Sequence, residues 1–197
     1  IASAHPRNYF PRNATRLTAL IAGSQPSATR YLEQAAALRS RSYSSLYNSA
    51  YTMEHFALVT QLTGDTSYCT FAVTGIEQFV TAEEGRIAAG TTPAVAGDSY
   101  LEVGPIVGDL SIVIDWCFEQ TTATQRARWL AYGDQAVWNV WHPDDAQWGG
   151  RARPWTGWSI DNPSNNYYYS FLRATMLLGI AGRGELASAD QWLDFFR

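Results

Sequence analysis

The stretch Ile106–Phe118 reads I-V-G-D-L-S-I-V-I-D-W-C-F, and its pattern indicates the fold class. Ile106, Leu110, Val113 and Cys117 recur every three or four residues, which is the spacing of one face of an α-helix. Further apolar side chains lie between them, which indicates a helix buried on more than one side. No stretch of the chain holds the strict alternation of a half-buried strand, so we expect an all-α fold without strands.

Helical spacing continues on both sides of this stretch. We expect helices over residues 27–39, 42–62, 66–89, 126–141, 167–180 and 186–197, and a short one that opens at Pro11–Asn13 with Asn13 as its N-cap. Short turns between consecutive helices produce antiparallel helical hairpins. A row of such hairpins either curves into a solenoid or closes into a toroid, and no fixed-period repeat of the ankyrin kind is visible.

Composition and motifs remove several classes of function. The chain has 197 residues, 46% of them hydrophobic, and a net charge of −4. This negative charge does not favour binding to the phosphates of a nucleic acid. There is no apolar run of about 18 residues, so we expect no membrane-spanning segment. All 14 basic residues are Arg, which excludes lysine nucleophiles. We expect no cofactor, because phosphate- and dinucleotide-binding motifs are missing, and no metal, because His142-Pro143-Asp144-Asp145 matches no known ligand spacing.

The first residues and the two cysteines bear on the cellular compartment. Ala2-Ser3-Ala4 fits the small-residue pattern that precedes a signal-peptidase cut, so residues 1–4 are either the remnant of an export signal or an ordinary part of the chain. In the first case the protein is secreted or periplasmic, and Cys69 and Cys117 are able to pair. Because both cysteines lie in helical, apolar contexts, we favour two buried, unpaired thiols.

Residues 138–169 form an aromatic loop, W-N-V-W-H-P-D-D-A-Q-W-G-G-R-A-R-P-W-T-G-W-S-I-D-N-P-S-N-N-Y-Y-Y, which holds five of the eight Trp residues. Flat aromatic faces beside Asn, Arg and Asp suit a cleft for a polyhydroxylated, acidic ligand. The alternative is an ordered loop whose aromatics plug the top of a helical domain. The predicted substrate-binding residues are Trp141, Trp148, Arg151, Arg153, Trp155 and Trp158, together with Glu102.

The order of motifs resembles a known family. His5-Pro6-Arg7 precedes a short helix, Asp109–Phe118 is followed by T-x-x-Q-R-x-R-W (Thr122–Trp129), and the aromatic loop ends in Asn165-Asn166-Tyr167 before an apolar helix. This order is similar to that of the N-terminal helical domain in heparinase II/III-like and alginate-lyase-type polysaccharide lyases, over nearly the whole chain. The resemblance implies an incomplete α/α toroid over residues 1–197 as a single domain, followed by a β-sheet domain in a longer protein.

The resemblance also implies β-elimination from a uronic-acid-containing polysaccharide. In that family an Asn at the start of a helix neutralises the uronate carboxylate, and the matching positions are Asn165 and Asn166. The family's catalytic Tyr and His have no matching positions here. Among the residues of the loop itself, His142 and Tyr167 are the candidates for the catalytic base. We predict that one Asn caps the helix and that Asn166 faces the cleft.

Two alternatives to a lyase stay open. The first is a non-catalytic glycan-binding domain, because the family's catalytic Tyr and His have no positions here. The second is a glycoside hydrolase on a helical toroid, which needs two carboxylates across a cleft. For that reaction Glu102 is the best single acid, and its partner is Asp161 or Asp109.

Overall fold

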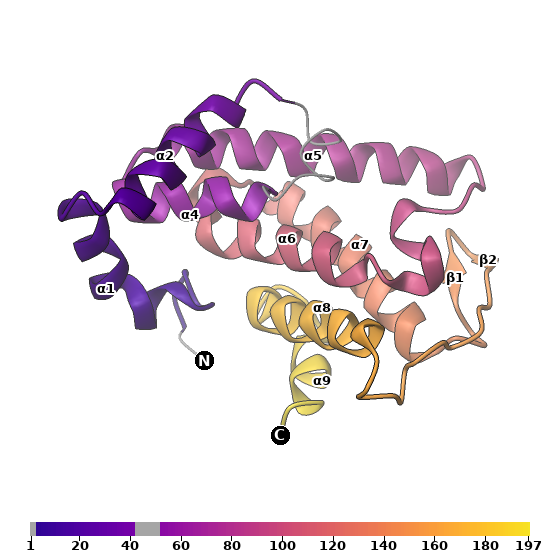
Figure 1. The fold of residues 1–197 in the computed structure, drawn as a ribbon. Coiled ribbons are helices and arrows are strands. Elements are labelled where there is room, and N and C mark those ends of the chain that lie inside the picture. The colour runs from indigo at the N-terminus through magenta and orange to yellow at the C-terminus, as the bar shows by residue number, and fades with distance from the viewer. Residues whose placement is uncertain (1–2, 42–51) are drawn as a thin grey trace. The chain divides into compact units, whose positions relative to one another are not determined.

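The computed structural model describes residues 3–41 and 52–197, and it is mostly helical, as predicted (Figure 1). The helices are α1 (Phe10–Ala22), α2 (Pro26–Leu38), α4 (Met53–Thr63), α5 (Thr66–Ala88), α6 (Val103–Trp116), α7 (Ala123–Trp141), α8 (Asn166–Gly182) and α9 (Ala189–Asp194). Short 3-10 turns occupy residues 94–96, 98–100 and 118–120. Within the described ranges, no helix combines the length and apolar character needed to cross a membrane.

The ends of the helices differ from the predicted ones. Helix α1 begins at Phe10, and Asn13 lies inside it and donates a hydrogen bond to the Tyr9 carbonyl at 2.9 Å, so the prediction of Asn13 as an N-cap is wrong. Helix α4 covers the last part of the helix predicted over residues 42–62, and residues 42–51 lie outside the described residues. The final helix is shorter than predicted, because α9 spans only Ala189–Asp194.

One small hairpin corrects the expectation of a fold without strands. Strands β1 (Gln147–Trp148) and β2 (Arg151–Ala152) pair antiparallel, with Trp148 opposite Arg151. Gly149 and Gly150 connect them with φ values of 57° and 73°. A two-residue turn with positive φ at both positions favours glycine, which has no Cβ to clash with the backbone. In the sequence, the glycine pair was the one indication of this hairpin turn. Strands of two residues are too short to show an alternating pattern.

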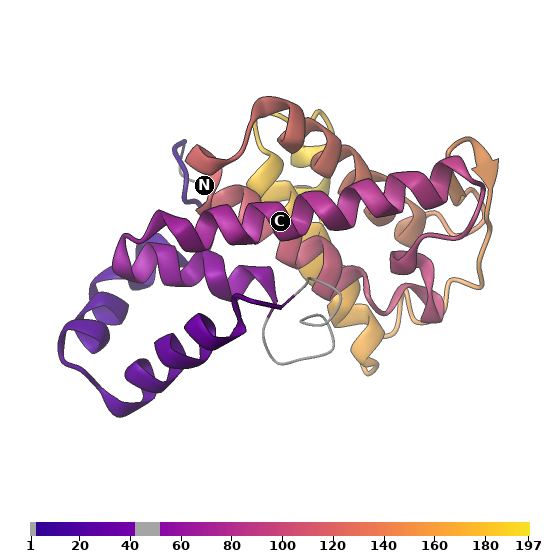
Figure 2. The same cartoon turned by 90° about the horizontal axis from the view of Figure 1, so that it is seen from above.

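The described residues divide into two compact units, one from those within residues 1–79 together with 112–122, and the other from residues 80–111 and 123–197. In the first unit α1, α2 and α4 pack against one another (Figure 2). In the second unit α8 packs against α7 and α9. The core of the second unit includes the buried rings of Tyr100, Trp148 and Phe171.

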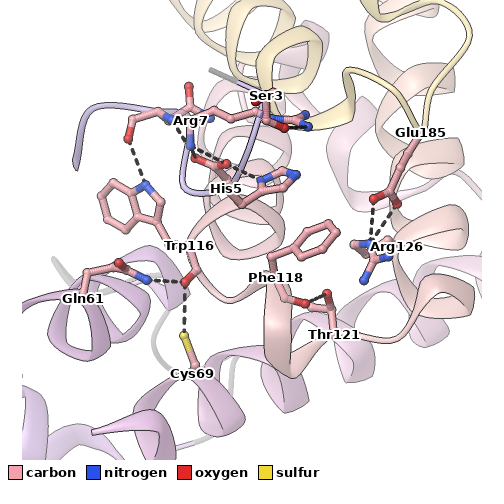
Figure 3. Close-up of polar contacts among 12 residues, drawn as sticks. Ser3, His5, Arg7, Gln61, Cys69, Trp116, Phe118, Thr121, Arg126 and Glu185 are labelled. Atoms are coloured by element: carbon pink, nitrogen blue, oxygen red, sulfur yellow. Dashed lines mark hydrogen bonds and ion pairs between the residues drawn. The ribbon is translucent and has the colours of Figure 1, made fainter. Parts of the chain in front are cut away.

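In the first unit, Cys69 of α5 and Cys117, which follows α6, form a disulfide with a Cα–Cα distance of 5.4 Å. The expectation of unpaired thiols is therefore wrong. Both cysteines are fully buried, as their apolar contexts predicted. Helical spacing reports that a side chain is buried, but it does not report which buried side chain on another helix lies opposite. Beside the disulfide, Gln61 Nε2 donates to the Trp116 carbonyl at 2.5 Å (Figure 3).

We expect the disulfide to stabilise the chain by roughly 2–4 kcal/mol, because a crosslink between residues 48 apart restricts the unfolded chain. The measurement is urea-induced unfolding with and without a reductant. A Cys69→Ala/Cys117→Ala variant should match the reduced protein and should not respond to the reductant. Equal unfolding free energies for oxidised and reduced protein would contradict the prediction.

The H-P-R motif holds the chain's first residues against α6. The side chain of Asp115 is fully buried and accepts hydrogen bonds from His5 Nδ1 at 2.6 Å, from the Arg7 backbone N–H at 2.8 Å and from the Asn8 backbone N–H at 2.7 Å (Figure 3). The His5 ring stacks on Phe118 with 4.1 Å between ring centroids. Three donors around one buried carboxylate indicate that Asp115 anchors the N-terminal segment.

Asp115→Asn should destabilise the chain by about 2–3 kcal/mol, because one acceptor oxygen becomes an NH₂ group that faces backbone donors. Urea unfolding measures the loss, and faster hydrogen exchange at the Asn8 amide should accompany it. Asp194→Asn is the matched control, since Asp194 forms an exposed ion pair with Arg197 that contributes little. An Asp115 variant as stable as this control would refute the anchoring role.

Candidate functional site

Helix α8 begins where the aromatic loop ends. Asn165 is its N-cap, and the Asn165 Oδ1 atom accepts a hydrogen bond from the Tyr167 backbone N–H at 3.0 Å. One of the two asparagines therefore caps the helix, as predicted. Asn166 is the first helical residue and its side chain is exposed. The first N–H groups of a helix have no acceptor within it, so the N-terminus of α8 favours an anion.

Tyr167 is held beside this N-terminus by an acidic partner from a distant loop. Its hydroxyl donates to Asp98 Oδ1 at 2.9 Å. This hydrogen bond raises the pKa of Tyr167, and loss of solvation and the negative charges of Asp98 and Glu102 raise it further. A phenol is already protonated at neutral pH at its ordinary pKa near 10, and the raised pKa makes its deprotonation still harder. Tyr167 is therefore poorly suited to be the base that the sequence predicted.

The backbone on the acidic side of this contact is strained. Residues 98–100 adopt φ values of 43°, 52° and 62°, a region that side-chain-bearing residues rarely occupy. The Tyr167 hydroxyl binds Asp98 at one end of this segment. At the other end, the hydroxyl of the buried Tyr100 is held by hydrogen bonds. Tyr100 Oη accepts hydrogen bonds from Trp148 Nε1 at 3.1 Å and from Asn139 Nδ2 at 3.3 Å. The surrounding fold thus fixes the Asp98 carboxylate in one place despite the cost of the strain.

The tryptophans of the aromatic loop divide into internal anchors and exposed faces. Trp141, Trp148 and Trp155 donate their indole N–H groups to Thr175 Oγ1, Tyr100 Oη and the Asn139 carbonyl, at 2.9, 3.1 and 2.8 Å. Their polar edges are therefore used inside the fold, which favours the plug interpretation for these three. Trp158 is 56% exposed and keeps a face in solvent.

Phe171 links the aromatic loop to the first turns of α8. The ring centroids of Trp141, Trp155 and Tyr167 lie 6.2, 6.1 and 6.4 Å from that of Phe171, all in edge-to-face geometry. Such pairs are favourable because the positive edge of one ring meets the negative face of another. The internal anchors thus position the helix start that carries Asn166.

Arg151 and Arg153, predicted to bind the substrate, contact backbone carbonyls at the end of α5 and just after it. Arg151 Nη1 donates to the Ile87 carbonyl at 3.0 Å, and Arg153 Nη2 donates to the Gly90 carbonyl at 2.5 Å. Cations are stabilising at a helix C-terminus, where carbonyls lack partners. Both side chains are exposed, and of the two only Arg151 bonds to a carbonyl of the last turn of α5.

The other predicted residues are scattered. His142 stacks on Trp138 with 3.6 Å between ring centroids, and its recorded contacts do not include Asn166 or Tyr167. Asp161 is exposed, whereas Asp109 is only 1% exposed and is poorly placed to reach a glycan. Glu102 is half-buried and close enough to raise the pKa of Tyr167.

Asp98 is the functional candidate that the sequence reasoning missed. It lies 69 residues before Tyr167, and no local pattern links the two positions.

Among residues 3–41 and 52–197, no group of three or more His, Cys, Asp and Glu side chains is arranged to hold a metal ion.

Comparison with family models, curated proteins and solved structures gives no match for this chain. The resemblance to polysaccharide lyases therefore rests on the motifs alone.

Replacing the Asp98 carboxylate should lower the pKa of Tyr167 toward its ordinary value near 10 in an Asp98→Asn variant. A folded pKa above the unfolded one contributes stability that is fully present below the unfolded pKa and is lost as the pH rises through the folded pKa. The effect is thus confined to strongly alkaline pH. An NMR titration of the tyrosine Cζ resonances measures it, with the exposed Tyr169 as internal control. An unchanged Tyr167 titration would show that Asp98 does not hold the hydroxyl.

Proposed function

We propose that this chain is a carbohydrate-active domain of the α/α-toroid kind, which binds an acidic polysaccharide at the start of α8 and serves a uronate β-elimination. The observation that carries the proposal is the succession of an exposed amide, Asn166, and a hydroxyl with a raised pKa, Tyr167, at a helix N-terminus. The resemblance to polysaccharide lyases further suggests that the helices form a toroid and that a β-sheet domain follows it.

The first requirement of β-elimination is to neutralise the substrate carboxylate, because the C5 proton is not acidic while that carboxylate keeps its full charge. The Asn166 amide donates to the carboxylate without adding a group that titrates. Free backbone N–H groups and the partial positive charge at the start of α8 act in the same direction. These donors stabilise the extra negative charge that develops as the proton leaves.

The second requirement is a proton for the departing glycosidic oxygen. Tyr167 stays protonated at neutral pH, and in this proposal its O–H turns from Asp98 to the glycosidic oxygen and gives up its proton there. The phenolate that is left regains a proton from water. His142 is the sequence-based candidate for the base that removes the C5 proton, although in the structure its ring stacks on Trp138. The buried Cys69–Cys117 disulfide supports a secreted or periplasmic location, where oxidising conditions maintain such bonds.

A specific observation favours glycoside hydrolysis as a second candidate. Asp98 and Glu102 both raise the pKa of Tyr167, so two carboxylates lie near one hydroxyl. Hydrolysis uses one carboxylic acid and one carboxylate on either side of the scissile bond. In this version Asp98 takes the place of the buried Asp109 as the partner of Glu102.

Two asparagine variants test where the polysaccharide binds. Asn166→Ala should weaken binding of a uronate oligosaccharide by about 1–3 kcal/mol, because it removes a hydrogen bond to a charged group, and it should leave thermal stability nearly unchanged. Asn165→Ala is the matched control, since loss of the cap should cost about 1 kcal/mol of stability. Calorimetric titration and thermal unfolding measure the two effects. An Asn166 variant that binds normally would remove Asn166 from the site.

The substrate panel is alginate, heparan sulfate, hyaluronan and chondroitin, assayed together for binding, for the ultraviolet absorbance of unsaturated uronates and for new reducing ends. Absorbance identifies a lyase, whereas reducing ends without absorbance identify a hydrolase. Binding without either product supports the glycan-binding alternative for this chain. If none of the four polymers binds, the proposal fails.

A further inference from the structure

Helix α7 carries a second candidate site, in a pocket of about 570 Å³ within the second unit. Leu130, Asp134, Gln135 and Trp138 line it from α7, at the spacing of one helix face. Gln147 of β1 and Glu185, which follows α8, complete the polar lining. None of these side chains was among the predicted substrate-binding residues.

Trp138 supplies a flat platform in this pocket. It is 37% exposed, which makes it one of the few large hydrophobic side chains left open to solvent. The His142 ring stacks on it at 3.6 Å between centroids and 12° between planes, so the indole is braced in one orientation. A braced indole loses little conformational freedom when a ligand packs against it, and its face suits the C–H side of a sugar ring.

The pocket's amides are held in fixed positions by Asn139, which is fully buried. Gln135 Nε2 donates to Asn139 Oδ1 at 2.9 Å, and Gln147 Nε2 donates to Gln135 Oε1 at 3.0 Å. Gly150 N–H donates to Gln147 Oε1 at 2.9 Å, which fixes the second amide. Each NH₂ group has two hydrogens, so each glutamine keeps one N–H that no protein acceptor uses in the described part of the chain.

Acceptors accompany these donors. Asp134 Oδ1 accepts hydrogen bonds from Ser188 Oγ at 2.5 Å and from Trp192 Nε1 at 2.7 Å, and these bonds orient the carboxylate. The second oxygen, Oδ2, has no protein donor within residues 3–41 and 52–197. Glu185 forms an ion pair with Arg126 at 2.8 Å (Figure 3). Amide donors and carboxylate acceptors around an aromatic face match a ring that carries several hydroxyls.

We propose that this pocket is a carbohydrate-binding subsite for a neutral hexose residue, and this assignment does not rest on the function proposed at the start of α8. Asp134 and Glu185 both line the pocket, and the charge of Glu185 is offset by Arg126. Asp134 forms no ion pair within residues 3–41 and 52–197, so its negative charge disfavours an acidic sugar and the occupant is neutral. Helix α7 rises about 16 Å between residues 127 and 138, which gives room for a short oligosaccharide.

The probes are maltotriose, cellotriose and mannotriose as neutral sugars, with digalacturonate as the acidic comparison, added to the 197-residue chain. We expect at least one neutral trisaccharide to shift the NMR resonances of the Trp138 indole and of the Gln135 and Gln147 side-chain amides. Gln135→Ala should weaken that binding about two- to tenfold, because it removes one hydrogen-bonding group. Trp138→Ala should weaken it at least as much, and Trp158→Ala should leave it unchanged.

Three results would overturn the proposal. One is the absence of shifts at these resonances with all three neutral sugars. Another is tighter binding of digalacturonate than of any neutral probe at Trp138. The third is movement of the Trp138 resonance with protein concentration alone, which would mean that a second copy of the chain covers the pocket. Asn166→Ala should not alter the neutral-sugar shifts, so failure here and failure at the start of α8 are distinguishable.

Discussion

The buried side chain of Asn139 is the interaction on which most of the second unit's polar architecture depends. Its amide donates to the Gln147 carbonyl at 2.8 Å and to the Tyr100 hydroxyl, while its Oδ1 accepts from the Gln147 and Gln135 N–H groups. Its backbone carbonyl accepts from Trp155. A fully buried amide is costly unless its donors and acceptors are paired, so this network fixes the hairpin, the strained segment 98–100 and the α7 pocket together.

The first unit depends on a different pair of constraints. A covalent bond joins α5 to the end of α6, and a buried carboxylate on α6 gathers the N-terminal segment through His5 and two backbone N–H groups. Both constraints act at the C-terminal end of α6, where Asp115 lies in the last turn and Cys117 directly follows the helix. The H-P-R motif is therefore best explained here by anchoring, which requires no ligand.

The aromatic loop shows why composition alone does not identify a ligand site. The five tryptophans of the loop have the same side-chain chemistry. The indole N–H groups of Trp141, Trp148 and Trp155 nevertheless donate to acceptors inside the fold. Trp138 and Trp158 are partly exposed, so part of each indole ring contacts solvent. The arginines behave in the same way, because Arg151 and Arg153 donate to backbone carbonyls at the end of α5 and just after it. Structural and ligand-binding roles thus share one segment.

Features that depend on neighbours three or four residues apart could be predicted from the sequence. Apolar spacing located the long helices, and the Asn165-Asn166 pair before an apolar run located the N-cap of α8. The contacts between distant positions could not be predicted in this way: the disulfide across 48 residues, Tyr167 with Asp98 across 69, and His5 with Asp115 across 110. The physical reason is that helical periodicity specifies which face of a helix is buried, whereas the partner on that face depends on the path of the whole chain.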